Sequence, residues 1–174
     1  MVKFLNRYVR FVDQLNEYVG ISVSFLTSAL VLLICYDVIT RYLFSVTHVA
    51  IFELEWHIFA LIFILGAAYT LKHDKHVRVD IFYSRFSEKG KALVNLFGTI
   101  FFLVPFCLVV INGGIPYLET SLKLSEGSND PGGLPARYII KGSIIVGFSL
   151  LLLQGTSLII TSFFKLTGKN GQVA

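Results

Sequence analysis

The chain has 174 residues, of which 55% are hydrophobic and only 15% are charged. An average soluble domain is roughly 25% charged, and the mean hydropathy of +0.71 departs in the same direction, so the composition excludes an ordinary soluble domain. Lys and Arg exceed Asp and Glu by four, 15 against 11. We nevertheless expect no nucleic-acid partner, because no folded basic domain is left to bind one.

Four long segments contain no Asp, Glu, Lys or Arg, and they cover residues 18–36, 56–71, 92–118 and 142–164. About 20 apolar residues in a helix cross a hydrocarbon core of roughly 30 Å. Three segments reach that length. The second reaches it if its helix begins near Ile51, with Glu53 and Glu55 at the interface and Trp56 as an aromatic anchor. The sequence therefore predicts an all-α membrane protein, a single membrane domain with four transmembrane helices.

The N-terminal part is expected to contain two elements. Residues 1–18 place apolar and charged side chains on opposite helical faces, which predicts an amphipathic helix lying in the headgroup region. The first span is expected over about residues 19–40, and its apolar run is longer than the 7–15 residues of a signal peptide. Asp37 and Arg41 are four residues apart, so we expect an ion pair between them near the outer interface.

The remaining spans are expected over about residues 51–71, 92–112 and 138–164. Ser87 is the expected N-cap of the third helix, and Pro105 is expected to kink that helix. Residues 113–137 contain three of the four prolines and the run SEGSNDPGGLP. This density of turn residues predicts a loop on the outer side over the whole of residues 113–137.

The distribution of Lys and Arg predicts the orientation. Eleven of them lie in the N-terminus, in the connection between the second and third spans, and in the C-terminus, whereas four lie on the opposite side. By the positive-inside rule, both termini and the middle connection are expected in the cytoplasm.

Glu53, Glu55 and His57 form the most informative polar group, because ionisable residues in or next to a span are candidates for function. Glu53 and His57 fall on one helical face. A self-assembling channel or a carrier for protons or ions would use such a group. The favoured alternative is that these residues face a partner protein, or form a ring with Arg41 at the outer interface.

No cofactor or metal ion is expected. Haem in a four-helix membrane cytochrome needs paired histidines on facing helices, but only His57 lies inside a predicted span. Cys35 and Cys107 form no CxxC pair of the kind that a thiol oxidase uses. His73 and His76 lie in a basic turn, which is more typical of a solvated loop than of a metal site. The residues thus predict a membrane subunit that acts by interaction and not an enzyme.

Several short motifs occur in an order that resembles one known family. They are Arg41-Tyr42, Glu55-Trp56, GAAYTL at residues 66–71, HVRVD at 76–80, PGGLPARY at 131–138, Gly147-Phe148 and LQG at 153–155. Together with the four spans, these motifs resemble the small membrane subunit, of the DctQ type, of tripartite ATP-independent periplasmic (TRAP) transporters. The resemblance covers about residues 16–163, and GGLPARY resembles the subgroup associated with keto- and hydroxy-acid-like organic anions.

The resemblance implies a three-part importer in a bacterial inner membrane. A periplasmic substrate-binding protein would capture an organic acid, and a large multi-span membrane subunit would carry it inward by an elevator motion with a sodium gradient. The small subunit, embedded in the lipid bilayer, would brace the large one. Because the substrate and sodium sites of such families lie in the large subunit, no substrate-binding residue is expected in this chain.

The matching positions are instead expected to have structural roles or to lie at subunit interfaces. The candidates are Asp37, Arg41, Glu53, Glu55 and Trp56 at the outer interface, His76, Arg78 and Asp80 in the turn after the second span, and Gly133, Leu134, Pro135, Arg137 and Tyr138 in the outer loop. Within the spans, the small residues Gly98, Gly147 and Gly155 are expected to allow close contact between helices.

Overall fold

The computed structural model describes residues 2–74, 83 and 86–168. The helices are α1 (Val2–Leu43), α2 (Val49–Lys72), α4 (Glu88–Gly98), the π-helix η1 (Thr99–Leu103), α5 (Val104–Lys123) and α6 (Tyr138–Leu166). Because α4, η1 and α5 are continuous, they form one unit, and the described residues contain four helical units long and apolar enough to cross a membrane. The described residues contain no strand. The predicted all-α architecture with four spans is confirmed.

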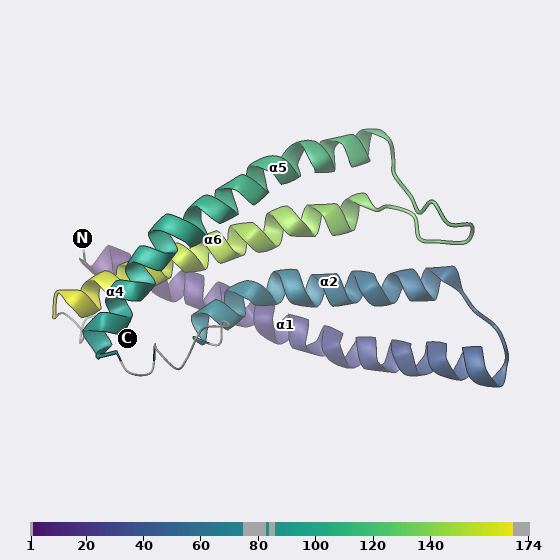
Figure 1. Ribbon diagram of the computed structural model, residues 1–174, viewed down its shortest axis with the longest axis horizontal. Helices are drawn as coiled ribbons and strands as arrows, with labels where there is room; N and C mark the ends of the chain where they lie inside the picture. Colours follow the sequence, from purple (N-terminus) through teal and green to yellow (C-terminus); the bar gives the residue numbers. More distant parts are fainter. Residues whose placement is uncertain (1, 75–82, 84–85, 169–174) are drawn as a thin grey trace.

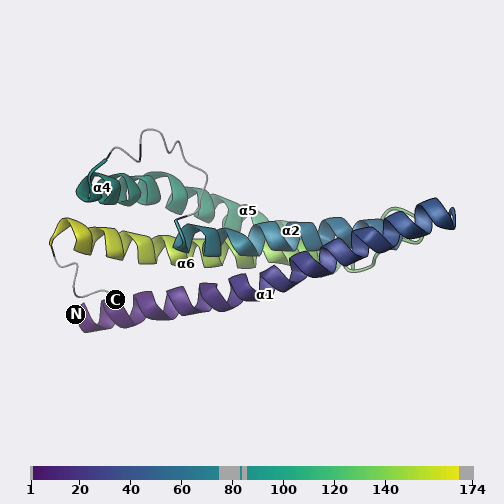
Figure 2. The same cartoon turned by 90° about the horizontal axis from the view of Figure 1, so that it is seen from below.

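Helix α6 lies at the centre of the bundle. It contacts α1, α2, α4 and α5, while α1 and α2 pack together as a second pair (Figure 1). The first residues of α1, the last residues of α6 and helix α4 gather at one end of the bundle, here named the terminal end (Figure 2). The connection from α1 to α2 and the segment of residues 124–137 lie at the other end, here named the loop end (Figure 1).

Helix α1 is continuous over 42 residues. At 1.5 Å per residue it is about 63 Å long, roughly twice the thickness of a hydrocarbon core. The amphipathic helix expected over residues 1–18 and the first span are therefore parts of one helix. Val9 and Val12 are buried, whereas Phe4 and Phe11 are exposed. The N-terminal third of α1 thus uses one face for packing inside the protein and leaves aromatic side chains on another.

The third helical unit begins where its sequence predicts, and its regular α-helical geometry is interrupted just before Pro105. Ser87 caps α4, because its hydroxyl accepts a hydrogen bond of 3.2 Å from the backbone N–H of Gly90. The π-helix η1 comes directly before α5, in which Pro105 is the second residue. Proline cannot donate a hydrogen bond to the preceding turn, and π-turns are among the usual sites at which a helix departs from regular geometry.

The loop between α5 and α6 is shorter than expected. The prediction of a loop from residue 113 was wrong for residues 113–123, because α5 continues to Lys123 with Pro116 inside it. Gly113, Gly114 and Pro116 are poor helix formers in water. In a membrane, however, a helix keeps its backbone groups bonded within the segment, and this requirement outweighs intrinsic propensity. Residues 124–137 form the connection, named below the 124–137 loop.

Two of the three small residues expected at helix contacts do lie at such contacts. A Cβ atom added to Gly147 would lie 2.8 Å from the backbone oxygen of Ile64, and one added to Gly155 would lie 2.5 Å from the Leu103 side chain. The expectation was wrong for Gly98, where an added Cβ would meet no atom within 4 Å. Gly147 therefore sets the closest approach of α6 to α2.

We expect Gly147→Ala to destabilise the protein by about 1–3 kcal/mol, because the new methyl group meets backbone atoms of α2 that cannot rotate away. The free energy of unfolding in detergent checks this. Gly113→Ala is the matched control, since an added Cβ there has open space. Equal stability of the two variants would contradict the close approach.

Candidate functional site

The most connected polar side chain at the loop end is Glu53, in the first turns of α2. It is only 3% exposed, and its carboxylate accepts a 2.6 Å hydrogen bond from the backbone N–H of Leu134. The guanidinium of Arg137 donates to it at 3.2 Å, and the hydroxyl of Ser128 donates to it as well. A buried carboxylate is stable only when such donors replace its water. Glu53 therefore attaches the 124–137 loop to α2.

The double glycine of the loop makes this attachment sterically feasible. A Cβ atom on Gly133 would lie 2.8 Å from Glu53 Oε2 and would also overlap Ser128. Gly132 has a φ of +79°, in the left-handed region that glycine adopts without strain. Together the two glycines bring the N–H of Leu134 against the carboxylate.

Backbone hydrogen bonds close the 124–137 loop on itself. The N–H of Ser128 donates to the carbonyl of Leu134 at 2.9 Å, and the N–H of Arg137 donates to the carbonyl of Glu126 at 2.8 Å. Ala136 has a φ of +65°, which turns the chain into α6 at Tyr138. The loop therefore presents a defined backbone shape before any partner contacts it.

A second ion pair connects this loop to α5 and α6. Lys141 donates to the carboxylate of Glu126, and its ammonium lies 4.0 Å from the ring centroid of Tyr117. The hydrogen bond from Lys141 holds the pKa of Glu126 below its ordinary value. The pair and the cation–π contact together hold the base of the loop.

Asp37 and Arg41 form the ion pair that their spacing predicts, and Asp37 is buried. Glu55 of α2 lies near both of these charges. Its Oε1 atom is buried and has no hydrogen-bond partner among the residues that the structure describes. Glu53 and Glu55 thus occupy different surroundings, because side chains two positions apart on a helix point to different faces.

His57 and Trp56 do not join the two glutamates in one site. The Nδ1 atom of His57 lies 2.6 Å from the backbone carbonyl oxygen of Glu53, within the same helix. The indole of Trp56 packs on the imidazole with the ring centroids 3.8 Å apart. Glu53, Glu55 and His57 therefore do not converge as a proton or ion site would require.

The remaining predicted site residues lie in the 124–137 loop, at the start of α6 or outside the described residues. Pro135 precedes the left-handed Ala136, and Tyr138 is the first residue of α6. His76, Arg78 and Asp80 lie outside the described residues. Their expected role in ordering the turn after α2 stays a prediction.

A polar cluster at the terminal end was not predicted as a site. Asn16, which is fully buried, donates to Gln154 at 2.7 Å. Gln154 donates to Asp13 at 3.0 Å, and Ser157 donates to the same carboxylate oxygen at 3.1 Å. The sequence signal was the pair Gln154 and Ser157, three residues apart within a predicted span, since polar side chains commonly bond across membrane helices. This cluster joins α1 to α6.

We expect Glu53→Gln to loosen the 124–137 loop, because the new amide group faces donors and removes the charge that pairs with Arg137. Hydrogen exchange at the amides of Leu134 and Arg137 should be about tenfold faster or more. Glu119→Gln, an exposed position on α5, is the control. Equal exchange rates in both variants would mean that Glu53 does not hold the loop.

The Glu126 pair predicts a pH dependence. Because the pKa of Glu126 is lower in the folded protein, its contribution is complete above the ordinary pKa of about 4.3. This contribution is lost as the pH falls through the lowered value. Glu126→Gln should therefore reduce the melting temperature at pH 7, and the difference from the unaltered chain should shrink below about pH 4. A difference independent of pH would exclude the ion pair as its cause.

The architecture and the two polar ends can now be compared with known proteins. Residues 30–165 match the family described as "Tripartite ATP-independent periplasmic transporters, DctQ component". No curated protein matches the chain. The family match covers most of the 174 residues, including α2, the 124–137 loop and nearly all of α6. The chain therefore belongs to the DctQ family and is a small membrane component of a TRAP transporter.

Proposed function

We propose that this chain is the static subunit of a TRAP importer, bracing the large multi-span membrane subunit while that subunit carries a small organic anion inward. The observation that carries the proposal is the apolar middle of the bundle. Its core consists of Ala68, Leu71, Cys107 and Leu151, and the described ion pairs lie toward the two ends. A carrier needs polar groups along its path, so this core favours a bracing role.

The loop end supports docking of a further protein. The 124–137 loop is held by Glu53, Arg137 and Lys141, so little ordering entropy is lost when a partner binds it. The excess of Lys and Arg at the terminal end favours cytoplasmic termini in the inner membrane. In this orientation the loop faces the periplasm, where a substrate-binding protein would meet it. The organic-anion substrate and the sodium coupling are parts of this proposal that the family resemblance implies.

Co-purification tests the proposal directly. When this chain is tagged in its native cell, we expect a much larger membrane protein to be recovered in equal amounts, as judged by quantitative mass spectrometry. Recovery of a stable single chain without that protein would contradict the bracing role.

A channel or carrier formed by this chain alone is the competing function. We expect the purified chain, reconstituted into vesicles, to show no proton or sodium flux above empty vesicles. Measurable flux that Glu53→Gln abolishes would favour the channel instead.

Glu55 is the strongest candidate for contact with the large subunit. Its side chain is half-buried, and its Oε1 atom lacks a partner among the described residues. Rotation of the carboxylate would bring this atom to a donor from another subunit. We expect Glu55→Ala to reduce recovery of the large subunit by about tenfold and to slow uptake, without changing which substrate is preferred. Glu119→Ala, exposed on α5, is the control. A changed substrate preference would mean that the substrate site extends into this chain.

A further inference from the structure

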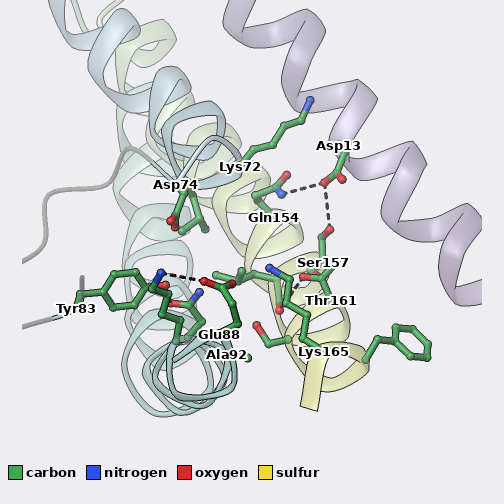
Figure 3. A pocket seen from close by; sticks show the side chains of 16 residues that line it. Asp13, Lys72, Asp74, Tyr83, Glu88, Ala92, Gln154, Ser157, Thr161 and Lys165 are labelled. Carbon is green, nitrogen blue, oxygen red and sulfur yellow. Dashed lines mark hydrogen bonds and ion pairs between the residues drawn. The ribbon is translucent and has the colours of Figure 1, made fainter. Parts of the chain in front are cut away.

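A polar cavity of about 520 Å³ lies at the terminal end, between α1, the end of α2, α4 and α6 (Figure 3). Ligand pockets commonly have volumes of roughly 300–1,000 Å³. Among the described residues, the charged side chains that line it are three acids and three bases: Asp13, Asp74, Glu88, Lys72, Lys91 and Lys165. The formal charges of these six groups cancel, so the cavity matches neither a simple anion nor a simple cation.

A second cavity, of about 530 Å³, adjoins the polar one. The two share four lining residues, Leu71, Tyr83, Asn95 and Leu158. The second cavity follows η1 and the start of α5, and most of its other lining residues are apolar. Phe102 and Phe106 in its wall are 76% and 56% exposed. Together the two cavities form one site, named here the composite site, that changes from charged to apolar along its length.

The lining of the composite site changes from charged to apolar at about the depth expected for a membrane boundary. Helix α6 begins at Tyr138, and the 19 residue steps from there to Ser157 cover about 29 Å, close to the roughly 30 Å of a hydrocarbon core. Ser157 and the last residue of α2, Lys72, line the polar cavity. If Tyr138 marks one membrane boundary, the polar cavity lies at headgroup depth and the apolar cavity at acyl-chain depth.

The charges in the polar cavity come from different helices (Figure 3). Asp13 of α1 is held by the hydrogen bonds from Gln154 and Ser157. On the opposite wall, Lys91 of α4 pairs with Glu88 at 2.9 Å, and Lys165 is contributed by α6. A ligand with separated positive and negative groups can face both walls at once.

We propose that the composite site holds one phospholipid whose head group carries a phosphate and a primary ammonium, as in phosphatidylethanolamine. Lys91 and Lys165 bind the phosphate, the ammonium faces Asp13, and an acyl chain lies in the apolar cavity past Gly98 and Phe102. A primary ammonium donates up to three hydrogen bonds to carboxylates. A choline group has no such donors and is typically recognised by aromatic cages.

The test uses the full-length chain with the proteins that accompany it from the membrane. The complex is placed in bilayers that contain equal amounts of phosphatidylethanolamine and phosphatidylcholine with identical acyl chains, and lipids retained after purification are counted by native mass spectrometry. We expect about one retained phosphatidylethanolamine per chain and at least about tenfold less phosphatidylcholine, a ratio that corresponds to about 1.4 kcal/mol.

Two glycines provide a matched pair of variants. Gly98 lines the apolar cavity, and a Cβ atom added there meets no atom within 4 Å, so Gly98→Leu introduces its side chain at the cavity wall without a contact between its Cβ and the fold. Gly113 has equal space but lies outside the composite site. We expect Gly98→Leu to reduce retention by about tenfold and Gly113→Leu to leave it unchanged. The double variant Lys91→Gln/Lys165→Gln should reduce retention of both lipids, because both carry the phosphate that these lysines bind.

Three results would overturn the proposal. Equal retention of both lipids by the unaltered chain would indicate bulk lipid only. Displacement of the retained lipid by millimolar inorganic phosphate would indicate a site for free anions. Cross-linking of a Gly98→Cys variant to a helix of another protein would show that a partner, and not a lipid, occupies the apolar cavity.

Discussion

The buried carboxylate of Glu53 is the interaction on which the loop end depends. It belongs to α2, in the first half of the chain, but its donors Ser128, Leu134 and Arg137 belong to the 124–137 loop. One side chain therefore connects the pair of helices α1 and α2 to the loop between α5 and α6. A buried carboxylate needs all of its donors, because removing any one of them leaves its charge buried without compensation. This need for donors restricts the position of the loop, since a residue without a side chain at Gly133 is needed for the loop to approach Glu53.

The terminal end is connected by different chemistry. Asn16, Asp13, Gln154 and Ser157 link α1 to α6 through side-chain hydrogen bonds. Between the two ends, α6 packs closely on α2, because Gly147 of α6 faces the backbone of Ile64 in α2. Lipid tails are as apolar as leucine, so close packing and polar contacts, and not apolar burial, hold membrane helices together. This division of contacts supports the proposed bracing role.

The spans, the Asp37–Arg41 pair and the Ser87 cap were predictable because each depends on local spacing or on a long apolar run. The outer loop was predicted to be longer than it is, because the glycines and the proline at residues 113–116 are poor helix formers in water and were therefore assigned to a loop. Gly98 was predicted at a helix contact because composition does not show which face of a helix meets a neighbour. The sequence drew attention to Glu53, Arg137 and Gly133 separately, but nothing in their spacing showed that they meet.

By itself the sequence determined the class of the protein, four membrane helices with charges kept to their ends, because crossing a bilayer imposes length and composition on each segment independently. The family motifs are likewise local. Only the tertiary structure decided which polar groups become partners: Glu53 with Arg137, Asn16 with Gln154, and Glu55 left beside Asp37. These partners lie more than 80 residues apart in the first two cases. The rotation and depth of each helix place them together, and those are set by packing against α6.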